Sequence, residues 1–188
     1  RLSDGGALKM LGVGRITRQK NIPAFIEALA LAVKEHDVDV YVDWAGRVDV
    51  VSEAAAAKDA LEAHNLEKRW RWLGEVGDLP VRMCNYDALV LPSLWEGMPN
   101  AICEAFASGL PVLASNVSDN PILVEEGVRG FLFDPRKSEE IASAIVRFCR
   151  LSEDSRERMA QSARAYAEQK LSIDNLVDSY EKLLQERD

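Results

Sequence analysis

Two glutamates, Glu96 and Glu104, stand eight positions apart around a loop whose residues suit ligand binding. An ionised carboxylate only accepts hydrogen bonds, and the hydroxyl groups of a sugar are suitable donors. Gly97 lets the backbone come close to a ligand, Pro99 fixes the approach of the chain, and Asn100 is a good N-cap for a following helix. The loop therefore predicts a site in which two carboxylates hold hydroxyl-bearing rings.

Two cations, Arg15 and Lys20, flank a turn near the start of the chain. Guanidinium and ammonium groups suit the oxygens of a pyrophosphate. Both stand just before an expected helix, where the partial positive charge of the helix terminus disfavours cations. Arg15 and Lys20 could be ordinary surface charges, but their position before a helix favours a bound anion. In the same way, Glu96 or Glu104 taken alone could be a structural residue.

The elements around these residues predict that all four charged side chains meet. Apolar runs at residues 7–13 and 86–91 read as buried strands that end just before the cations and the acidic loop. A helix with apolar spacing follows each turn, and its free N–H groups attract an anion. Because ligands of open α/β sheets bind at the carboxyl ends of parallel strands, we expect the groups at one edge.

The rest of the chain alternates strands and helices about six times, which predicts an α/β fold. We expect a doubly wound parallel sheet of about six strands with helices on both faces, and tryptophans on its strands in the core. Further strands are expected at residues 40–45, 70–73, 110–114 and 130–133. Helices are expected at residues 52–64, 79–85, 123–126 and 155–169, and three more are expected to begin at residues 22, 138 and 172. Asn21 is expected to cap the first helix, and Met83 and Cys84 to point inward.

The acidic loop fits the pattern P-S-x-x-E-G-x-P-N-x-x-x-E-A-x-A-x-G-x-P-V over residues 92–112, and the cations fit G-R-x-x-x-x-K-N over residues 14–21. With these motifs the sequence resembles the retaining nucleotide-sugar glycosyltransferases of family 4, which have the GT-B fold. The resemblance runs from Leu8 to the last expected helix. It implies that residues 1–188 form a single, Rossmann-like, donor-binding domain and that the amino-terminal acceptor domain is absent from this chain.

The resemblance also implies a role for each charged residue. Arg15 and Lys20 neutralise the departing nucleoside diphosphate, Glu96 approaches the hydroxyls of the donor sugar, and Glu104 holds the ribose. The implied catalytic set is Arg15, Lys20 and Glu96, and the implied donor-binding set is Gly14, Arg15, Lys20, Glu96, Gly97, Met98, Pro99, Asn100, Ala101 and Glu104. The loop at residues 75–79 is expected against the nucleobase, and neither a metal ion nor another cofactor is expected.

Three segments depart from patterns that they partly match. The family pattern has glycine and then glutamate near residue 121, where Ser118 and Ile122 stand, so no carboxylate role is expected there. Thr17 replaces the third glycine of a dinucleotide fingerprint. Asp37 and Asp39 form a D-x-D before a strand, at the wrong edge for a ligand, and are expected in a solvated turn.

Composition limits the class of protein. A chain of 188 residues with a net charge of −8 and a pI near 4.9 fits one acidic domain and argues against a nucleic-acid partner. Its three cysteines show no metal or disulfide spacing and are expected to be reduced, mostly buried thiols of a cytoplasmic protein. No apolar run reaches the roughly 18 residues of a membrane span. Residues 1–6 resemble a linker, and any peripheral contact with the inner membrane face is expected through the missing half.

The resemblance implies an enzyme, a retaining hexosyltransferase of polysaccharide biosynthesis. It would move a sugar from a nucleotide donor, with UDP or GDP, to a saccharide or lipid-linked acceptor. A GT-B nucleotide-sugar epimerase and a non-catalytic nucleotide-sugar binding module remain alternatives. A glycosidase also uses two carboxylates, but the cations argue against hydrolysis of simple glycosides.

Overall fold

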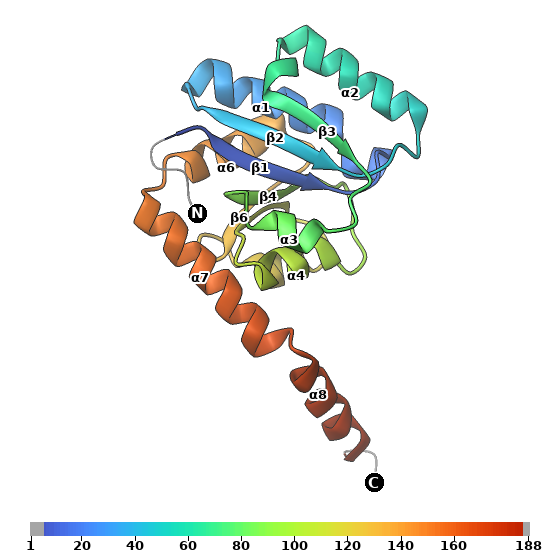
Figure 1. Cartoon of the computed structure of the whole chain (residues 1–188), viewed down its shortest axis with the longest axis vertical. Helices are drawn as coiled ribbons and strands as arrows, with labels where there is room; N and C mark the ends of the chain where they lie inside the picture. Colours follow the sequence, from blue (N-terminus) through green and yellow to red (C-terminus); the bar gives the residue numbers. More distant parts are fainter. Residues whose placement is uncertain (1–5, 186–188) are drawn as a thin grey trace.

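The computed structural model of the chain describes residues 6–185 (Figure 1). Within the last helix it leaves out the side chains of Asp174, Leu176, Asp178, Ser179, Tyr180 and Leu183. The expected linker at residues 1–6 therefore lies outside the described residues except for Gly6. The sequence also predicts an apolar stripe on this helix, and of its members Leu176, Val177, Tyr180, Leu183 and Leu184 three have side chains outside the described ones.

Six parallel strands form one sheet, which confirms the expected α/β architecture. The strands are β1 (Leu8–Val13), β2 (Val40–Ala45), β3 (Trp70–Gly74), β4 (Ala88–Leu91), β5 (Val112–Ser115) and β6 (Gly130–Phe133). Their order in the sheet is β3-β2-β1-β4-β5-β6. The direction of winding therefore reverses between β1 and β4, and ligands of such sheets bind at this switch point.

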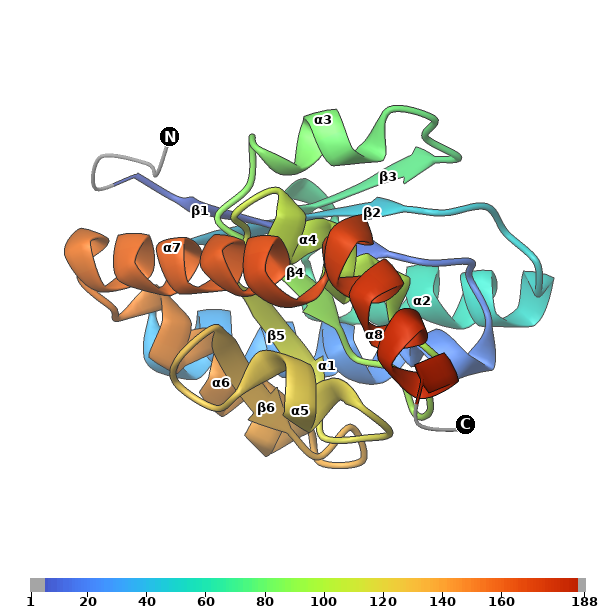
Figure 2. The ribbon, with the colours of Figure 1, turned by 90° about the horizontal axis from the view of Figure 1, so that it is seen from below.

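Helices cover both faces of the sheet. They are α1 (Ile22–His36), α2 (Val51–His64), α3 (Leu79–Met83), α4 (Asn100–Ala107), α5 (Asn120–Val124), α6 (Ser138–Cys149), α7 (Glu153–Lys170) and α8 (Ile173–Gln185). One apolar core lies under α1, α2 and α6, and the other lies under α3, α4 and α7. Figure 2 shows α7 lying across the same face as α4, and Figure 1 shows α8 continuing beyond the sheet.

The two cores follow from the alternation of side chains along buried strands. On β1, Met10 enters the core under α1, while Leu11 enters the core under α4, and neither side chain is exposed. Trp44 and Trp70 are buried in the first core with their rings stacked on each other, whereas Trp72 is 38% exposed. The expectation that the strand tryptophans belong to the core is therefore confirmed for two of the three.

Several local expectations are wrong. Asn21 does stand at the N-cap position of α1, as expected, but its side chain makes no cap hydrogen bond and donates from Nδ2 to the carbonyl oxygen of Pro135. Asn100 does not cap α4, because Pro99 is at the N-cap position and Asn100 lies inside the first turn. The helix expected at residues 123–126 spans Asn120–Val124 instead. A proline fits the first turn of a helix, so Pro121 belongs to its start, and Glu125 ends it with a positive φ of 47°.

Cys84 is exposed rather than inward, and its thiol lies 2.9 Å from the carbonyl oxygen of Val81. Cys103 and Cys149 are half-buried, so the expectation of mostly buried thiols is wrong for one of the three. Burial raises the pKa of the Cys103 thiol, and it raises the pKa of Cys149 to about 12. None of the three forms a disulfide.

We expect iodoacetamide near pH 8 to alkylate Cys84 first, because the thiolate is the reactive form and exposure controls access to it. Peptide mass spectrometry over a time course measures the order. Earlier labelling of Cys103 or Cys149 would contradict the burial described here.

Candidate functional site

A direct ion pair joins the loops that follow β1 and β4. The ammonium Nζ of Lys20 lies 2.6 Å from Oε1 of Glu96, and the two side chains are only 14% and 9% exposed. The sequence separates these residues by 76 positions, and the parallel sheet brings them together at its carboxyl edge. The prediction that these two charges share one edge agrees with the geometry, while their roles toward a ligand remain predictions.

Gly14 makes room for the side chain of Lys20. A Cβ added to Gly14 would lie 2.3 Å from Cε of Lys20, and the backbone of Gly14 has a φ of +142°. Between them the chain forms a 3₁₀ turn at Arg18–Lys20, which Asn21 closes in the left-handed conformation. The glycine is therefore needed because the lysine stem passes directly over it on the way to Glu96.

The chain just before Glu96 is held by the loop after β1. The amide N–H of Leu94 donates to the carbonyl oxygen of Gln19 at 2.8 Å, and Nε2 of Gln19 donates to the carbonyl oxygen of Trp95 at 2.8 Å. On the other side, the hydroxyl of Ser118 donates to the carbonyl oxygen of Glu96 at 2.8 Å. Three loops thus meet at the backbone of residues 94–96, which carries the Glu96 side chain.

Arg15 stands at the same edge but has a different partner. Its Nη1 lies 2.7 Å from Oδ2 of Asp49, and Nε of Arg47 lies 2.8 Å from Oδ1 of the same carboxylate. The hydrogen bond from Arg47 is the main cause that lowers the pKa of Asp49, with Arg15 adding to it. The Arg15 side chain is 62% exposed, and its guanidinium is held by Asp49.

The amino end of α4 offers backbone donors beside Glu96. The amide of Asn100 already donates to the carbonyl oxygen of Met98, and the amide of Ile102 donates to that of Pro99. In the described part of the chain, no protein acceptor is recorded for the amides of Gly97 and Ala101. Of the expected donor-binding residues Asn100 and Ala101, the first therefore has its amide occupied, and the second has its amide available to an anion.

Glu104 lies one turn further along α4. Its side chain is exposed, and no ion pair or hydrogen bond to it is recorded among the described residues. Pro99, in contrast, is buried, and Met98 is 78% exposed on the outside of the loop. The structure therefore leaves the Glu104 carboxylate exposed to solvent, and its contact to ribose remains a prediction.

Sequence reasoning missed Gln19, Asp49 and Ser118. Gln19 stands beside Lys20 in the turn, yet no periodic pattern marks it, because its contacts are to backbone atoms of a distant loop. Asp49 follows β2 by a few residues, and the edge rule alone could have placed it near Arg15. Ser118 drew notice only as a departure from a motif, although it contacts Glu96 directly.

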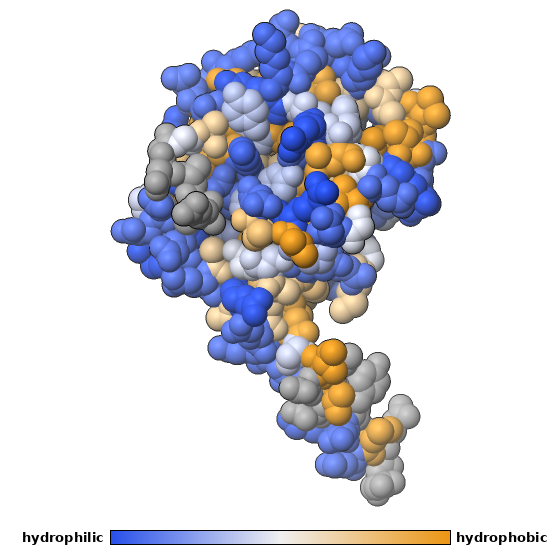
Figure 3. All heavy atoms as spheres, in the orientation of Figure 1, coloured by the Kyte–Doolittle hydropathy of each residue, from blue (hydrophilic) through white to orange (hydrophobic). Residues whose placement is uncertain are grey.

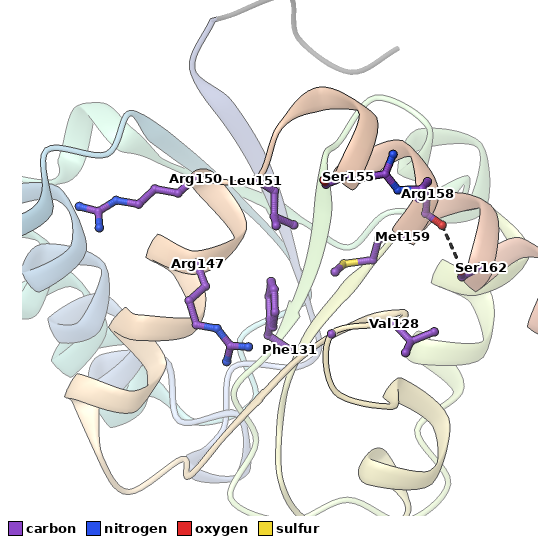
Figure 4. Close-up of a pocket in the computed structure, with 10 residues that line it drawn as sticks. Val128, Phe131, Arg147, Arg150, Leu151, Ser155, Arg158, Met159 and Ser162 are labelled. Atoms are coloured by element: carbon purple, nitrogen blue, oxygen red, sulfur yellow. Dashed lines mark hydrogen bonds between the residues drawn. The ribbon is translucent and has the colours of Figure 1, made fainter.

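A separate hollow in the described surface lies away from this site. It has a volume of about 770 Å³ and lies where α6, α7 and the start of β6 meet (Figure 4). Arg147, Arg150 and Arg158 stand on its rim with their guanidinium groups apart, and Phe131 and Met159 form part of its floor. It opens at the amino ends of the strands, so it is not part of the site at the carboxyl edge.

Two further features concern metal ions and membranes. In the described residues, no three histidine, cysteine, aspartate or glutamate side chains are grouped to hold a metal ion, and the expectation of a metal-free reaction remains a prediction. No helix in that same part of the chain has the length and apolar character needed to cross a membrane.

The reversal of winding between β1 and β4, with charged residues from both loops, places the chain among the doubly wound α/β domains that bind ligands at the carboxyl edge of the sheet. Residues 7–150 match the family model described as glycosyl transferases group 1. The chain therefore belongs to the group 1 glycosyl transferases.

Among curated relatives, a UDP-Gal:alpha-D-GlcNAc-diphosphoundecaprenol alpha-1,3-galactosyltransferase of Escherichia coli is 36% identical over 141 residues, which are 72% of this chain and 35% of that protein. Sucrose synthase 2 of Pisum sativum is 27% identical over 162 residues, which are 78% of this chain and 20% of that protein. The chain thus spans about a third or less of these two relatives.

Solved structures agree on the fold. Alr3699/HepE of Anabaena in complex with UDP-glucose matches with a TM-score of 0.85 and 25% identity over 96% of this chain and 49% of that chain. The carboxyl-terminal domain of the group 1 family protein LpcC from Francisella tularensis matches with a TM-score of 0.76 and 23% identity over 88% of this chain and 87% of that domain. The expected six-stranded, Rossmann-like fold is confirmed.

Proposed function

We propose that the chain is the donor-binding domain of a retaining glycosyltransferase of family 4. The enzyme would move a sugar from a UDP-sugar to a saccharide or lipid-linked acceptor. The contact between Lys20 and Glu96 at the switch point is the observation that carries the proposal, because it puts a cation for phosphate next to an acceptor for sugar hydroxyls.

The chemical step breaks the bond between the anomeric carbon and the diphosphate. Negative charge then accumulates on the departing diphosphate oxygens. The ammonium of Lys20, the guanidinium of Arg15 and the free amide of Ala101 at the start of α4 would stabilise that charge. Because these groups stand in place before the reaction, they would lower the barrier through electrostatic preorganisation.

The carboxylates would orient the donor rather than exchange its protons. Glu96, fixed beside Lys20, would accept hydrogen bonds from the sugar, so that the anomeric carbon faces the acceptor across the crevice. The exposed Glu104 would accept hydrogen bonds from the two ribose hydroxyls. UDP is the favoured nucleotide, since the E. coli relative is named for UDP-Gal and the Anabaena protein was solved with UDP-glucose.

An amino-terminal acceptor domain would close the crevice from the other side. Exposed apolar side chains on three loops at the carboxyl edge support this, namely Val48, Val50 and Val51 after β2, Trp95 and Met98 after β4, and Ile122 in α5. Apolar atoms gather on the right of the molecule in Figure 3, which is the side to which the arrowheads of β1 and β2 point in Figure 1.

The test is a calorimetric titration of the chain with UDP, GDP, ADP and their sugar conjugates. We expect UDP to bind, and Glu104→Ala to weaken its binding about tenfold, because the hydrogen bonds that are lost go to an exposed carboxylate, where water competes for the same groups. Glu157→Ala, which removes an exposed glutamate on α7, is the matched control and should bind UDP normally. If no nucleotide binds, or if Glu104→Ala binds UDP normally, the proposed donor site or its ribose contact is wrong.

A further inference from the structure

Ser118 lies in a backbone conformation that serine rarely adopts. It has a φ of +50° in the loop between β5 and α5. This left-handed conformation is easily reached by glycine and is unfavourable for a residue with a Cβ atom. A residue held in such a conformation requires a compensating interaction from its surroundings, and these cases cluster at functional sites.

The side chain of Ser118 supplies that interaction at the site. Its hydroxyl donates to the carbonyl oxygen of Glu96 at 2.8 Å, and the amide N–H of Glu96 donates to Oγ of Ser118 at 3.4 Å. The hydroxyl thus touches both peptide groups that flank the Cα atom of Glu96. On the other side of the loop, Gln19 binds the backbone of Leu94 and Trp95.

We propose that Ser118 is a positioning residue that fixes the backbone of Glu96 and so aims its carboxylate at Lys20 and at the donor sugar. The part that concerns the sugar rests on the proposed function, while the part that concerns Lys20 does not. With both flanking peptide groups held, the Cα–Cβ bond of Glu96 has a fixed direction, and few side-chain rotamers keep Oε1 at 2.6 Å from Nζ of Lys20.

The substitution Ser118→Gly separates positioning from stability. Glycine adopts the φ of +50° without strain, so the variant should fold, and this relief of strain should offset part of the stability that is lost with the hydroxyl and with a looser ion pair. It loses the hydroxyl that holds Glu96. If Ser118 were purely structural, its loss would change the unfolding temperature but would leave the Lys20–Glu96 pair intact.

The first experiment needs no ligand. The fall in unfolding temperature caused by Glu96→Gln is measured in the parent chain and in the Ser118→Gly chain, as one double-mutant cycle. We expect the fall to be about half as large in the Ser118→Gly chain, because the ion pair is already loosened there. Equal falls in both chains would overturn the proposal. Ser162→Ala is the matched control, since its hydroxyl also donates to a backbone carbonyl, at 2.9 Å, but far from the site.

The second experiment compares UDP with UDP-glucose and UDP-galactose. In the parent chain, a higher affinity for the UDP-sugar than for UDP alone measures the contribution of contacts to the sugar. We expect Ser118→Gly to reduce that gain about threefold to tenfold and to leave the affinity for UDP unchanged. An undiminished gain would overturn the role toward the sugar. If the parent chain bound none of the three, the proposed function would fail, while the double-mutant cycle would still decide whether Ser118 positions Glu96.

Discussion

Replacement of Lys20 by methionine is expected to abolish most of the affinity for a nucleoside diphosphate and to lower the free energy of unfolding by about 3 kcal/mol. Methionine keeps the apolar stem that passes over Gly14 and removes only the charge. The carboxylate of Glu96 then stays 9% exposed without its cation. An unpaired charge in such a place is costly, because neither water nor a counter-charge compensates for its burial.

The loss of binding has a separate cause. A hydrogen bond from an ammonium to a phosphate oxygen is charge-assisted, and its removal from a partly desolvated site should weaken UDP binding about 100-fold. Calorimetry with UDP measures this effect, and denaturant unfolding measures the stability. Lys58→Met is the matched control, because Lys58 also pairs with a glutamate, Glu62, but at 3.6 Å with side chains that are 73% and 56% exposed. That surface pair should contribute less than about 1 kcal/mol.

The double variant Lys20→Met, Glu96→Gln distinguishes the two causes. Removing both charges leaves no buried ion, so much of the lost stability should return. Binding of UDP should not return, since the cation for the phosphate is still absent. A double variant that recovers UDP binding would show that Lys20 acts only as the counter-charge of Glu96 and not on the donor.

The strands and most of the helices could be predicted from local patterns. The runs at residues 40–45 and 130–133 match β2 and β6, because short apolar stretches between turn residues are buried strands in parallel sheets. The start of α5 and the absence of side-chain caps on α1 and α4 could not be predicted in the same way. The amide of Asn21 donates to the carbonyl oxygen of Pro135, 114 positions away, and such a contact exists only after the sheet has formed. The amide of Asn120 donates to the carbonyl oxygen of Ser115 at the end of β5.

The site was predictable only in part, for the same reason. The edge rule brings Lys20 and Glu96 together, because it depends only on strand direction. It does not fix which charges pair, and Arg15 binds Asp49 rather than either glutamate. The hydroxyl of Ser118 contacts backbone atoms of Glu96. Because every residue type has the same backbone atoms, no sequence pattern indicates this contact.

Replacement of Gly46 by alanine is expected to have the largest effect on the backbone of the site. Gly46 follows β2, and a Cβ atom there would lie 1.9 Å from the carbonyl oxygen of Gly14. That oxygen also accepts a hydrogen bond at 2.9 Å from Nε1 of the buried Trp44. The clash is with backbone rather than with a flexible side-chain end, so the loop after β1 must move and must give up this bond.

We expect Gly46→Ala to lower the free energy of unfolding by about 3 kcal/mol, the cost of a steric clash together with a lost buried hydrogen bond. Because Gly14 is the residue over which the Lys20 stem passes, the variant should also bind UDP more weakly at a temperature where it is still folded. Urea unfolding and calorimetry measure the two effects. Gly77→Ala is the control, since no atom lies within 4 Å of a Cβ at that position, and its stability should change by less than about 0.5 kcal/mol. Equal stability of the two variants would mean that the loops after β1 and β2 can separate without cost, and the placement of Lys20 would then need another explanation.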